Sequence, residues 1–112
     1  MSDCLFCKIS NKEIPAKVEY EDDDLIVIHD INPQAAVHIL LIPKRHIDRI
    51  DALQDGDAGL MGTLLIRAKD LAQKNGWEDF RLVFNNGAAA GQTVFHIHMH
   101  LLTGRPMGWP PG

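Results

Sequence analysis

The chain has 112 residues, of which 46% are hydrophobic and 23% charged, and this predicts one globular domain spanning residues 1–112. Its formal net charge of −4 argues against broad nucleic-acid binding, because such binding needs a basic face that displaces counterions. No basic region precedes an apolar run at the start, and no apolar stretch approaches the ~20 residues of a membrane helix. We therefore expect a cytoplasmic protein without a membrane contact, whose cysteines stay reduced.

The first half of the chain predicts a short helix or turn followed by two strands. Residues 4–12 carry apolar side chains at helical spacing. The β-branched segment Leu25–Ile28 predicts a strand, which Asp30–Pro33 ends with turn chemistry. His38–Ile42 predicts the next strand, and Pro43 closes it.

The second half predicts one long helix between strands. Apolar residues recur at intervals of three and four over 57–75, which is typical of an amphipathic helix, and Gly76 fits its end. Strands are predicted at 80–84 and 94–102, and residues 103–112 form an irregular tail that is either disordered or docked through Trp109. This order predicts an α+β fold, in which a mainly antiparallel sheet carries the long helix on one face and a short helix precedes it.

Three of the six histidines lie within five residues, at His96, His98 and His100. On a strand their side chains share one face, and the opposite face, which suits packing against the helix, takes Phe95, Ile97, Met99 and Leu101. Alternate side chains are ~6.6 Å apart, so one ligand can contact two neighbouring imidazoles, whereas three in a row hardly converge on one metal. A solvated polar face is the structural alternative. A row of titratable rings brings no structural benefit, however, and favours a role as base, nucleophile or ligand.

A loop of small residues, 85–93, leads into the histidine segment. Such loops let backbone N–H groups approach an anion closely. Alone, the composition is typical of a plain surface turn. Beside three histidines it predicts a phosphate cradle, to which Thr93 adds a hydroxyl and Asn85 an amide.

The pattern His-apolar-His-apolar-His-apolar-apolar, over His96–Leu102, resembles the histidine triad (HIT) nucleotide-binding family. Further segments match that family's motifs in order and spacing: 12–17, 29–35, 42–46, 91–94, 104–105 and 109–112. The last of these and 30–35 are most similar to the Hint branch, the purine nucleoside phosphoramidases. Thr93 departs from this branch, which often has serine there, and Gln92-Thr93-Val94 also resembles the dinucleoside polyphosphate hydrolases. The leaving group therefore stays open.

The resemblance implies a catalytic role for each histidine of the motif. His98 would attack the α-phosphorus and form a nucleotidyl-histidine, which water then hydrolyses. His100 would bind a non-bridging oxygen, and His96 and His38 would orient the constellation. Thr93 would help to relay a proton to the leaving nitrogen, since an amine leaves poorly unless it is protonated.

The resemblance also implies a purine nucleotide site. Asp30 would accept hydrogen bonds from the ribose hydroxyls, although a turn residue is the structural alternative. Asn85, Gly91 and Gln92, with Thr93, would surround the phosphate, and the tail would bring Trp109 toward a partner's site. The positions expected around base and ribose are Leu5, Phe6, Ile9, Ile28, His29 and Ile31, whose apolar members also suit a core.

Cys4 and Cys7 have the spacing of half a structural zinc site. The zinc-bearing members of the family imply His46 and His96 as the other two ligands. Two small buried cysteines are the structural alternative. Such a zinc would tie the N-terminal turn to the histidine strand, and the resemblance implies that the chemistry at His98 needs no cofactor.

The leading prediction is thus a hydrolase of purine nucleoside phosphoramidates or related AMP conjugates. The alternatives are a dinucleoside polyphosphate hydrolase and a nucleotide-binding scaffold whose hydrolysis is incidental. A zinc hydrolase with its metal on the three histidines is disfavoured, because no acidic base lies near them in sequence. The family also implies a homodimer that uses the long helix and an edge strand.

Overall fold

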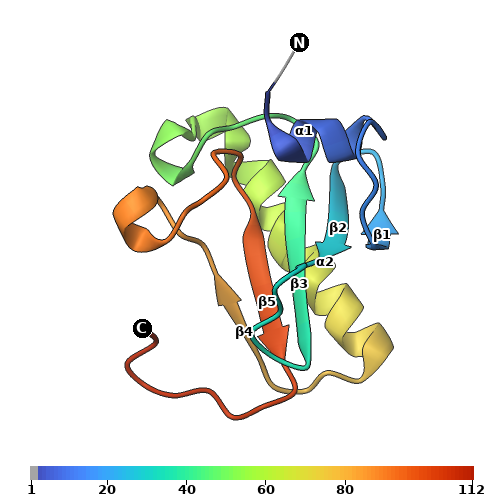
Figure 1. The fold of residues 1–112 in the computed structure, drawn as a ribbon, viewed down its shortest axis with the longest axis vertical. Coiled ribbons are helices and arrows are strands. Elements are labelled where there is room, and N and C mark those ends of the chain that lie inside the picture. The colour runs from blue at the N-terminus through green and yellow to red at the C-terminus, as the bar shows by residue number, and fades with distance from the viewer. Residues whose placement is uncertain (1–2) are drawn as a thin grey trace.

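The computed structural model describes residues 3–112, which form one five-stranded sheet flanked by two helices (Figure 1). All neighbouring strands run antiparallel, in the order β1-β2-β3-β5-β4. This confirms the predicted α+β class. The strands are β1 (Val18–Glu21), β2 (Leu25–His29), β3 (Val37–Pro43), β4 (Phe80–Val83) and β5 (Met99–Thr103).

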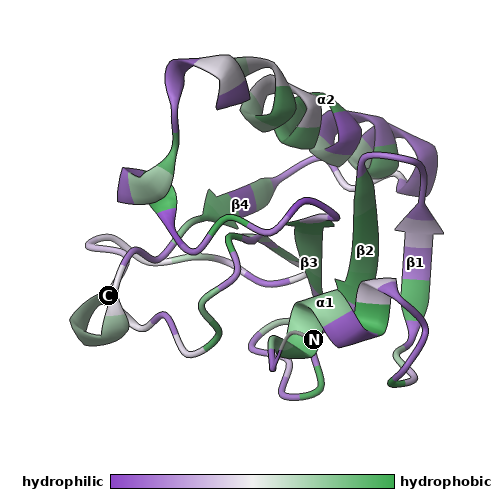
Figure 2. Cartoon of the chain, turned by 90° about the horizontal axis from the view of Figure 1, so that it is seen from above, coloured by the Kyte–Doolittle hydropathy of each residue, from purple (hydrophilic) through white to green (hydrophobic). Residues whose placement is uncertain are grey.

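The central strands β2 and β3 are buried on both faces, because a helix covers each face of the sheet there. The long helix α2 (Ala58–Asn75) lies over one face and the short helix α1 (Leu5–Ser10) over the other, as Figure 2 shows. Strand residues alternate between the two. The α2 side holds Leu25, Val27, Ile39, Leu41, Met99 and Leu101, and the α1 side holds Ile26, Ile28, Leu40 and Ile42.

The two ends of α2 have the chemistry that a helix requires. Two short 3-10 turns, Ile50–Ala52 and Asp55–Asp57, precede it, and Gln54 and Asp57 form a capping box on the second turn, which leads directly into α2. Gly76 ends it in the left-handed region at φ 71°, where only glycine pays no steric cost. The predicted helix over 57–75 is confirmed, as is its stop.

Sequence reasoning missed one strand and placed the start of another too early. The first strand, β1, has too few apolar residues to signal a strand, since its side chains are exposed or half-buried at the sheet edge. The strand expected over 94–102 begins only at Met99. Before that point the N–H of Ile97 donates to the Ile47 carbonyl, beyond the end of β3, so residues 94–98 leave the ladder. Phe95 is accordingly 43% exposed and does not pack against α2.

The tail beyond β5 is irregular, as expected. Arg105 donates through Nε to the Gln34 carbonyl at 2.9 Å, and Arg81 donates to the Gly108 carbonyl at 2.8 Å. Trp109 is 85% exposed, so its ring is not docked on this chain. Neither helix of the described chain has the length and hydropathy to cross a bilayer.

Candidate active site

The orientation of the His98 ring identifies its reactive nitrogen. Nδ1 lies 2.8 Å from the carbonyl oxygen of His96. A carbonyl oxygen only accepts, so Nδ1 carries the proton and donates. In the neutral ring Nε2 then keeps its lone pair. Burial lowers the pKa of His98, so the ring is neutral near pH 7 and Nε2 is a nucleophile without any added base.

The His100 ring has the opposite protonation, because a chain of hydrogen bonds begins at the backbone. The N–H of Gln34 donates to His38 Nδ1 at 3.1 Å, which leaves the ring proton of His38 on Nε2. That nitrogen lies 2.8 Å from His100 Nδ1 and donates to it. His100 therefore carries its own proton on Nε2.

The two adjacent rings thus offer complementary groups. The ring centroids of His98 and His100 are 5.0 Å apart, with a lone pair on Nε2 of the first and an N–H on Nε2 of the second. Burial, reinforced by the neighbouring His98 and His38, lowers the pKa of His100 to about 4, and burial also lowers that of His38. Both rings are therefore neutral at pH 7, which is what the hydrogen-bond chain requires.

Asp30 stands at the end of β2, beside this chain. Its Oδ2 lies 3.5 Å from His38 Nε2, and its Oδ1 accepts from the N–H of Asn32 at 2.8 Å. His29, next to it, pairs through Nε2 with Glu19 at 2.8 Å. Glu19 lies on β1, the strand that sequence reasoning missed.

The loop before the histidines is held in place by Gln92. This side chain is 3% exposed, accepts from the N–H of Gly87 and donates to the carbonyls of Asp48 and Val94. Its polar atoms are therefore engaged within the protein. Gly91 has φ 100°, a backbone conformation that favours glycine, and the Asn85 amide lies beside it. Thr93 is exposed.

The apolar residues expected around a base fall into two groups. Phe6, Ile9 and Ile28 are buried in the cluster beneath α1, with 4, 6 and 5% exposure. Leu5 and Ile31 are 42% and 102% exposed, so they are available to a ligand or a partner. The Phe6 ring lies edge-to-face against His98, with centroids 4.9 Å apart.

Cys4, Cys7, His46 and His96 converge on one point, although 92 residues separate the first from the last. Each cysteine Sγ lies 3.3 Å from a histidine Nδ1, Cys4 from His96 and Cys7 from His46, and the two Nδ1 atoms are 3.1 Å apart. A tetrahedral zinc with bonds of about 2.3 Å to sulfur and 2.0 Å to nitrogen keeps its ligand atoms roughly 3.3 to 3.8 Å apart. The four atoms therefore fit a zinc ion.

The outer nitrogens of both histidines support the same conclusion. His96 Nε2 donates to the Pro43 carbonyl at 2.7 Å, and His46 Nε2 lies 2.6 Å from Asp48 Oδ1. Both Nδ1 lone pairs consequently face the thiols, and a carboxylate or carbonyl behind the ring is the usual support of a histidine ligand. Sequence reasoning missed Asp48, although its place two residues after His46 was a usable signal.

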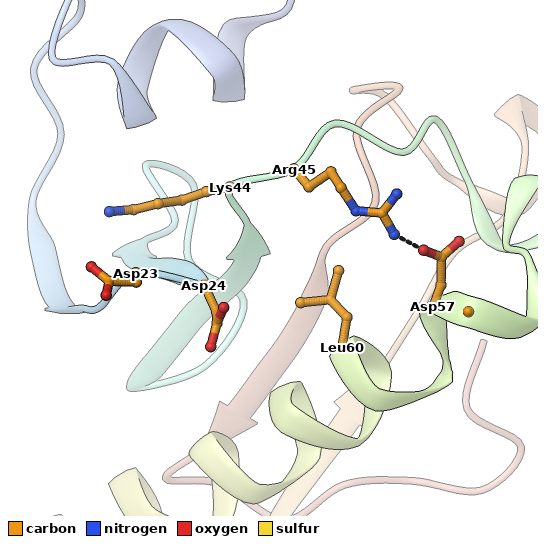
Figure 3. Close-up of a pocket in the computed structure, with 7 residues that line it drawn as sticks. Asp23, Asp24, Lys44, Arg45, Asp57 and Leu60 are labelled. Carbon is orange, nitrogen blue, oxygen red and sulfur yellow. Dashed lines mark ion pairs between the residues drawn. The ribbon is translucent and has the colours of Figure 1, made fainter.

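A second region of the surface is hollowed and charged, but its charges already pair within the protein. This cavity of about 540 Å³ lies where the turn between β1 and β2, the end of β3 and the start of α2 meet (Figure 3). Lys44 pairs with Glu21 at 2.8 Å, and Arg45 pairs with the buried Asp57. The cations that could attract an anion are thus neutralised, and this cavity is not the candidate site.

Comparison with known proteins finds relatives that are similar in sequence and in fold. A family profile described as "Scavenger mRNA decapping enzyme C-term binding" matches residues 3–108. An uncharacterized HIT-like protein of Synechocystis sp. is 53% identical over 111 residues, covering 98% of this chain and 97% of that protein. A solved HIT family hydrolase from Legionella pneumophila is 53% identical, with a TM-score of 0.95 over 98% of this chain and all of its own. A histidine triad protein from Clostridium difficile is 36% identical, with a TM-score of 0.92 over 96% of each chain.

Proposed function

Because this chain belongs to the histidine triad family, we propose that it is a hydrolase of purine nucleoside phosphoramidates that works through a nucleotide bound covalently to His98. One observation carries the proposal: two adjacent rings, buried His98 and half-buried His100, offer an unprotonated Nε2 on His98 and a protonated Nε2 on His100. A phosphoryl centre needs these two groups side by side, one to attack phosphorus and one to bind its oxygen.

The reaction proceeds in two displacements. His98 Nε2 forms a bond to the α-phosphorus as the P–N bond breaks, and the departing amine takes up a proton from solvent that the Thr93 hydroxyl helps to relay. Water then attacks the same phosphorus and releases a proton to solvent, the bond to Nε2 breaks, and AMP leaves. His100 donates its Nε2 proton as a hydrogen bond to a non-bridging oxygen throughout, because the donor from His38 holds its proton on that side.

The rest of the proposed site binds the nucleotide. The Asp30 carboxylate accepts from the ribose hydroxyls, and Asn85 and the backbone at Gly91 lie near the phosphate. Leu5, Ile31 and His29 stand around the base and ribose, and Trp109 is free to reach a partner's site. We place the activity in the cytoplasm, where thiols stay reduced.

Trapping the intermediate tests the proposal. After a quench with base and denaturant during turnover of adenosine 5′-phosphoramidate, intact mass should show a chain carrying AMP, and peptide mapping at alkaline pH should place the AMP on His98. His98→Ala should lose the adduct and nearly all turnover. His98→Gly should regain part of the turnover when imidazole is added. Turnover without any adduct, or an adduct that survives in His98→Ala, would refute the mechanism.

The leaving group is decided by a comparison of substrates. A diadenosine polyphosphate would use the same nucleophile with a phosphate leaving group, and Thr93 in place of serine favours examining it. Higher kcat/KM for the phosphoramidate supports the first proposal, whereas higher kcat/KM for the dinucleotide assigns the chain to the alternative. Binding of AMP without turnover of either substrate would indicate the scaffold role.

We also propose that Cys4, Cys7, His46 and His96 hold one structural zinc ion. The convergence of their four ligand atoms supports this, and zinc would supply a cross-link between α1 and the segments before β5. Metal analysis should give about one zinc per chain, lost in Cys7→Ser, and this holds whether or not the hydrolase proposal does.

We propose a homodimer as well. Apolar side chains that stay partly exposed lie on α2 and on the edge strand β4, namely Leu65, Ile66 and Phe80 at 51, 50 and 37% exposure. Light scattering should give twice the chain mass, and Leu65→Lys with Ile66→Lys should halve it.

A further inference from the structure

One turn of α1 lies against both the candidate metal cluster and the nucleophile. Cys4 and Cys7 reach His96 and His46 from either end of this turn. Phe6, between the two cysteines in sequence, points its ring at the histidine segment. Its centroid is 4.9 Å from that of His98 and 5.9 Å from that of His96, and both ring pairs are edge-to-face.

Burial makes the Phe6 contact a packing constraint. Phe6 is 4% exposed and His98 is 8% exposed, so neither ring can turn without displacing the other. Edge-to-face is one of the two arrangements that aromatic ring pairs prefer. The two rings meet at an interplanar angle of 85°, and this packing hinders rotation of the imidazole out of its observed plane.

The nitrogen of His98 that attacks depends on this ring orientation and on the hydrogen bond that Nδ1 makes in it. The bond from Nδ1 to the His96 carbonyl is 2.8 Å long and forms only when the ring lies in this orientation. A ring rotated about its χ2 angle would lose the bond, and with it the preference for a proton on Nδ1. Phe6 therefore helps to keep the lone pair on Nε2.

We propose that Phe6 is a positioning residue for His98, and that the Cys4–Cys7–His46–His96 cluster acts on the nucleophile by holding the α1 turn in place. The effect on catalysis rests on the proposed function. The effect of Phe6 on the His98 ring rests on ring geometry alone. It gives Phe6 a different role from the one the family resemblance implies, which is contact with the base.

Histidine nitrogen spectra at pH 7.5 test the structural part without any substrate. In the zinc-loaded wild type, His98 should be a single tautomer with its proton on Nδ1. In Phe6→Leu it should become a mixture of tautomers. Removal of zinc from the wild type should give the same mixture, and removal from Phe6→Leu should change it no further. Lys8→Ala, on the same helix and in contact with neither ring, should behave as wild type.

Kinetics with adenosine 5′-phosphoramidate test the catalytic part. Loss of positioning should lower kcat about tenfold or more in Phe6→Leu, because small misplacements of a reacting group are costly. KM should stay within about twofold, since uniform binding is not lost. Phe6→Met, of similar volume and without a ring, should show the same split.

Two results would overturn the proposal. A raised KM in Phe6→Leu with an unchanged His98 tautomer would indicate that Phe6 contacts the base and does not position His98. If the His98 nitrogen signals do not change when zinc is removed, the cluster does not act on the nucleophile. Should both Phe6 variants fail to fold, the zinc-removal spectra of the wild type still decide. If the protein cleaves no phosphoramidate, the proposed function is wrong, but the same spectra still show whether Phe6 positions the His98 ring.

Discussion

The chemistry at the site depends on which nitrogen of each imidazole carries a proton. Pattern alone suggested that the three histidines share a face; the structure brings the rings of His98 and His100 to within 5.0 Å, whereas His96 lies beside the cysteines. The pattern could not assign protons, since the groups that fix them are backbone atoms: the carbonyls of His96 and Pro43 and the N–H of Gln34. Such partners leave no trace in residue type.

His38 provides the sharpest test of this hydrogen-bond chain. His38→Leu removes the donor to His100 Nδ1, so the proton of His100 is no longer held on Nε2. We expect kcat to fall about tenfold or more, as for loss of an aligned donor. His38→Gln keeps an amide donor and should retain more activity. Steady-state kinetics measure both, and equal kcat in the two variants would contradict the chain.

Burial of neutral His100 makes stability depend on pH. Its folded pKa of about 4 lies below the ordinary value of 6.5, so the unfolded chain binds the extra proton between these values. Its contribution to stability is complete above pH 6.5 and is lost as the pH falls toward 4. Urea unfolding should therefore give a lower unfolding free energy at pH 5 than at pH 7. His100→Gln should show a smaller difference, and an equal one would contradict the shift.

Among the elements, those with strong periodicity were predicted and those that depend on partners were not. The helix over 57–75 and the strands around Leu25–Ile28 and His38–Ile42 carry continuous apolar signals. β1 lies at the sheet edge with mostly polar side chains, so nothing local marks it. The late start of β5 arises because Ile97 bonds to Ile47, a contact across 50 residues.

The start of α2 depends on Asp57. This carboxylate is 5% exposed, accepts from the N–H of Gln54 and pairs with Arg45. Asp57→Asn leaves the exposed Arg45 without its partner and weakens the cap, so we expect a loss of about 1–2 kcal/mol in unfolding free energy. Asp55→Asn, in the same 3-10 turn but exposed, is the matched control and should change little. Urea titration measures both.

In the whole molecule, the candidate zinc cluster joins parts of the chain that are far apart in sequence. α1 lies on the opposite face of the sheet from α2 (Figures 1 and 2), and a zinc ion on the four candidate ligand atoms would hold it to the segments at 46 and 96. The Cys-x-x-Cys spacing predicted half of this site. The other half came from resemblance, because no local pattern connects His46 with His96.

Removal of the metal should therefore destabilise the fold as a whole. At free zinc a thousandfold above its Kd, binding contributes about 4 kcal/mol. Chelation should lower Tm by several degrees, and added zinc should restore it. Cys7→Ser should begin with the lower Tm and gain nothing from zinc. If neither chelator nor added zinc changes the Tm of the wild type, the metal is not structural.

The central claim is that Nε2 of His98 faces the α-phosphorus of a bound nucleotide. A crystal structure with AMP tests it most directly. We expect the phosphorus to lie about 3 to 3.5 Å from His98 Nε2, with a non-bridging oxygen accepting a hydrogen bond from His100 Nε2. AMP bound elsewhere on the sheet, or a His98 ring that turns Nδ1 toward the phosphorus, would contradict it.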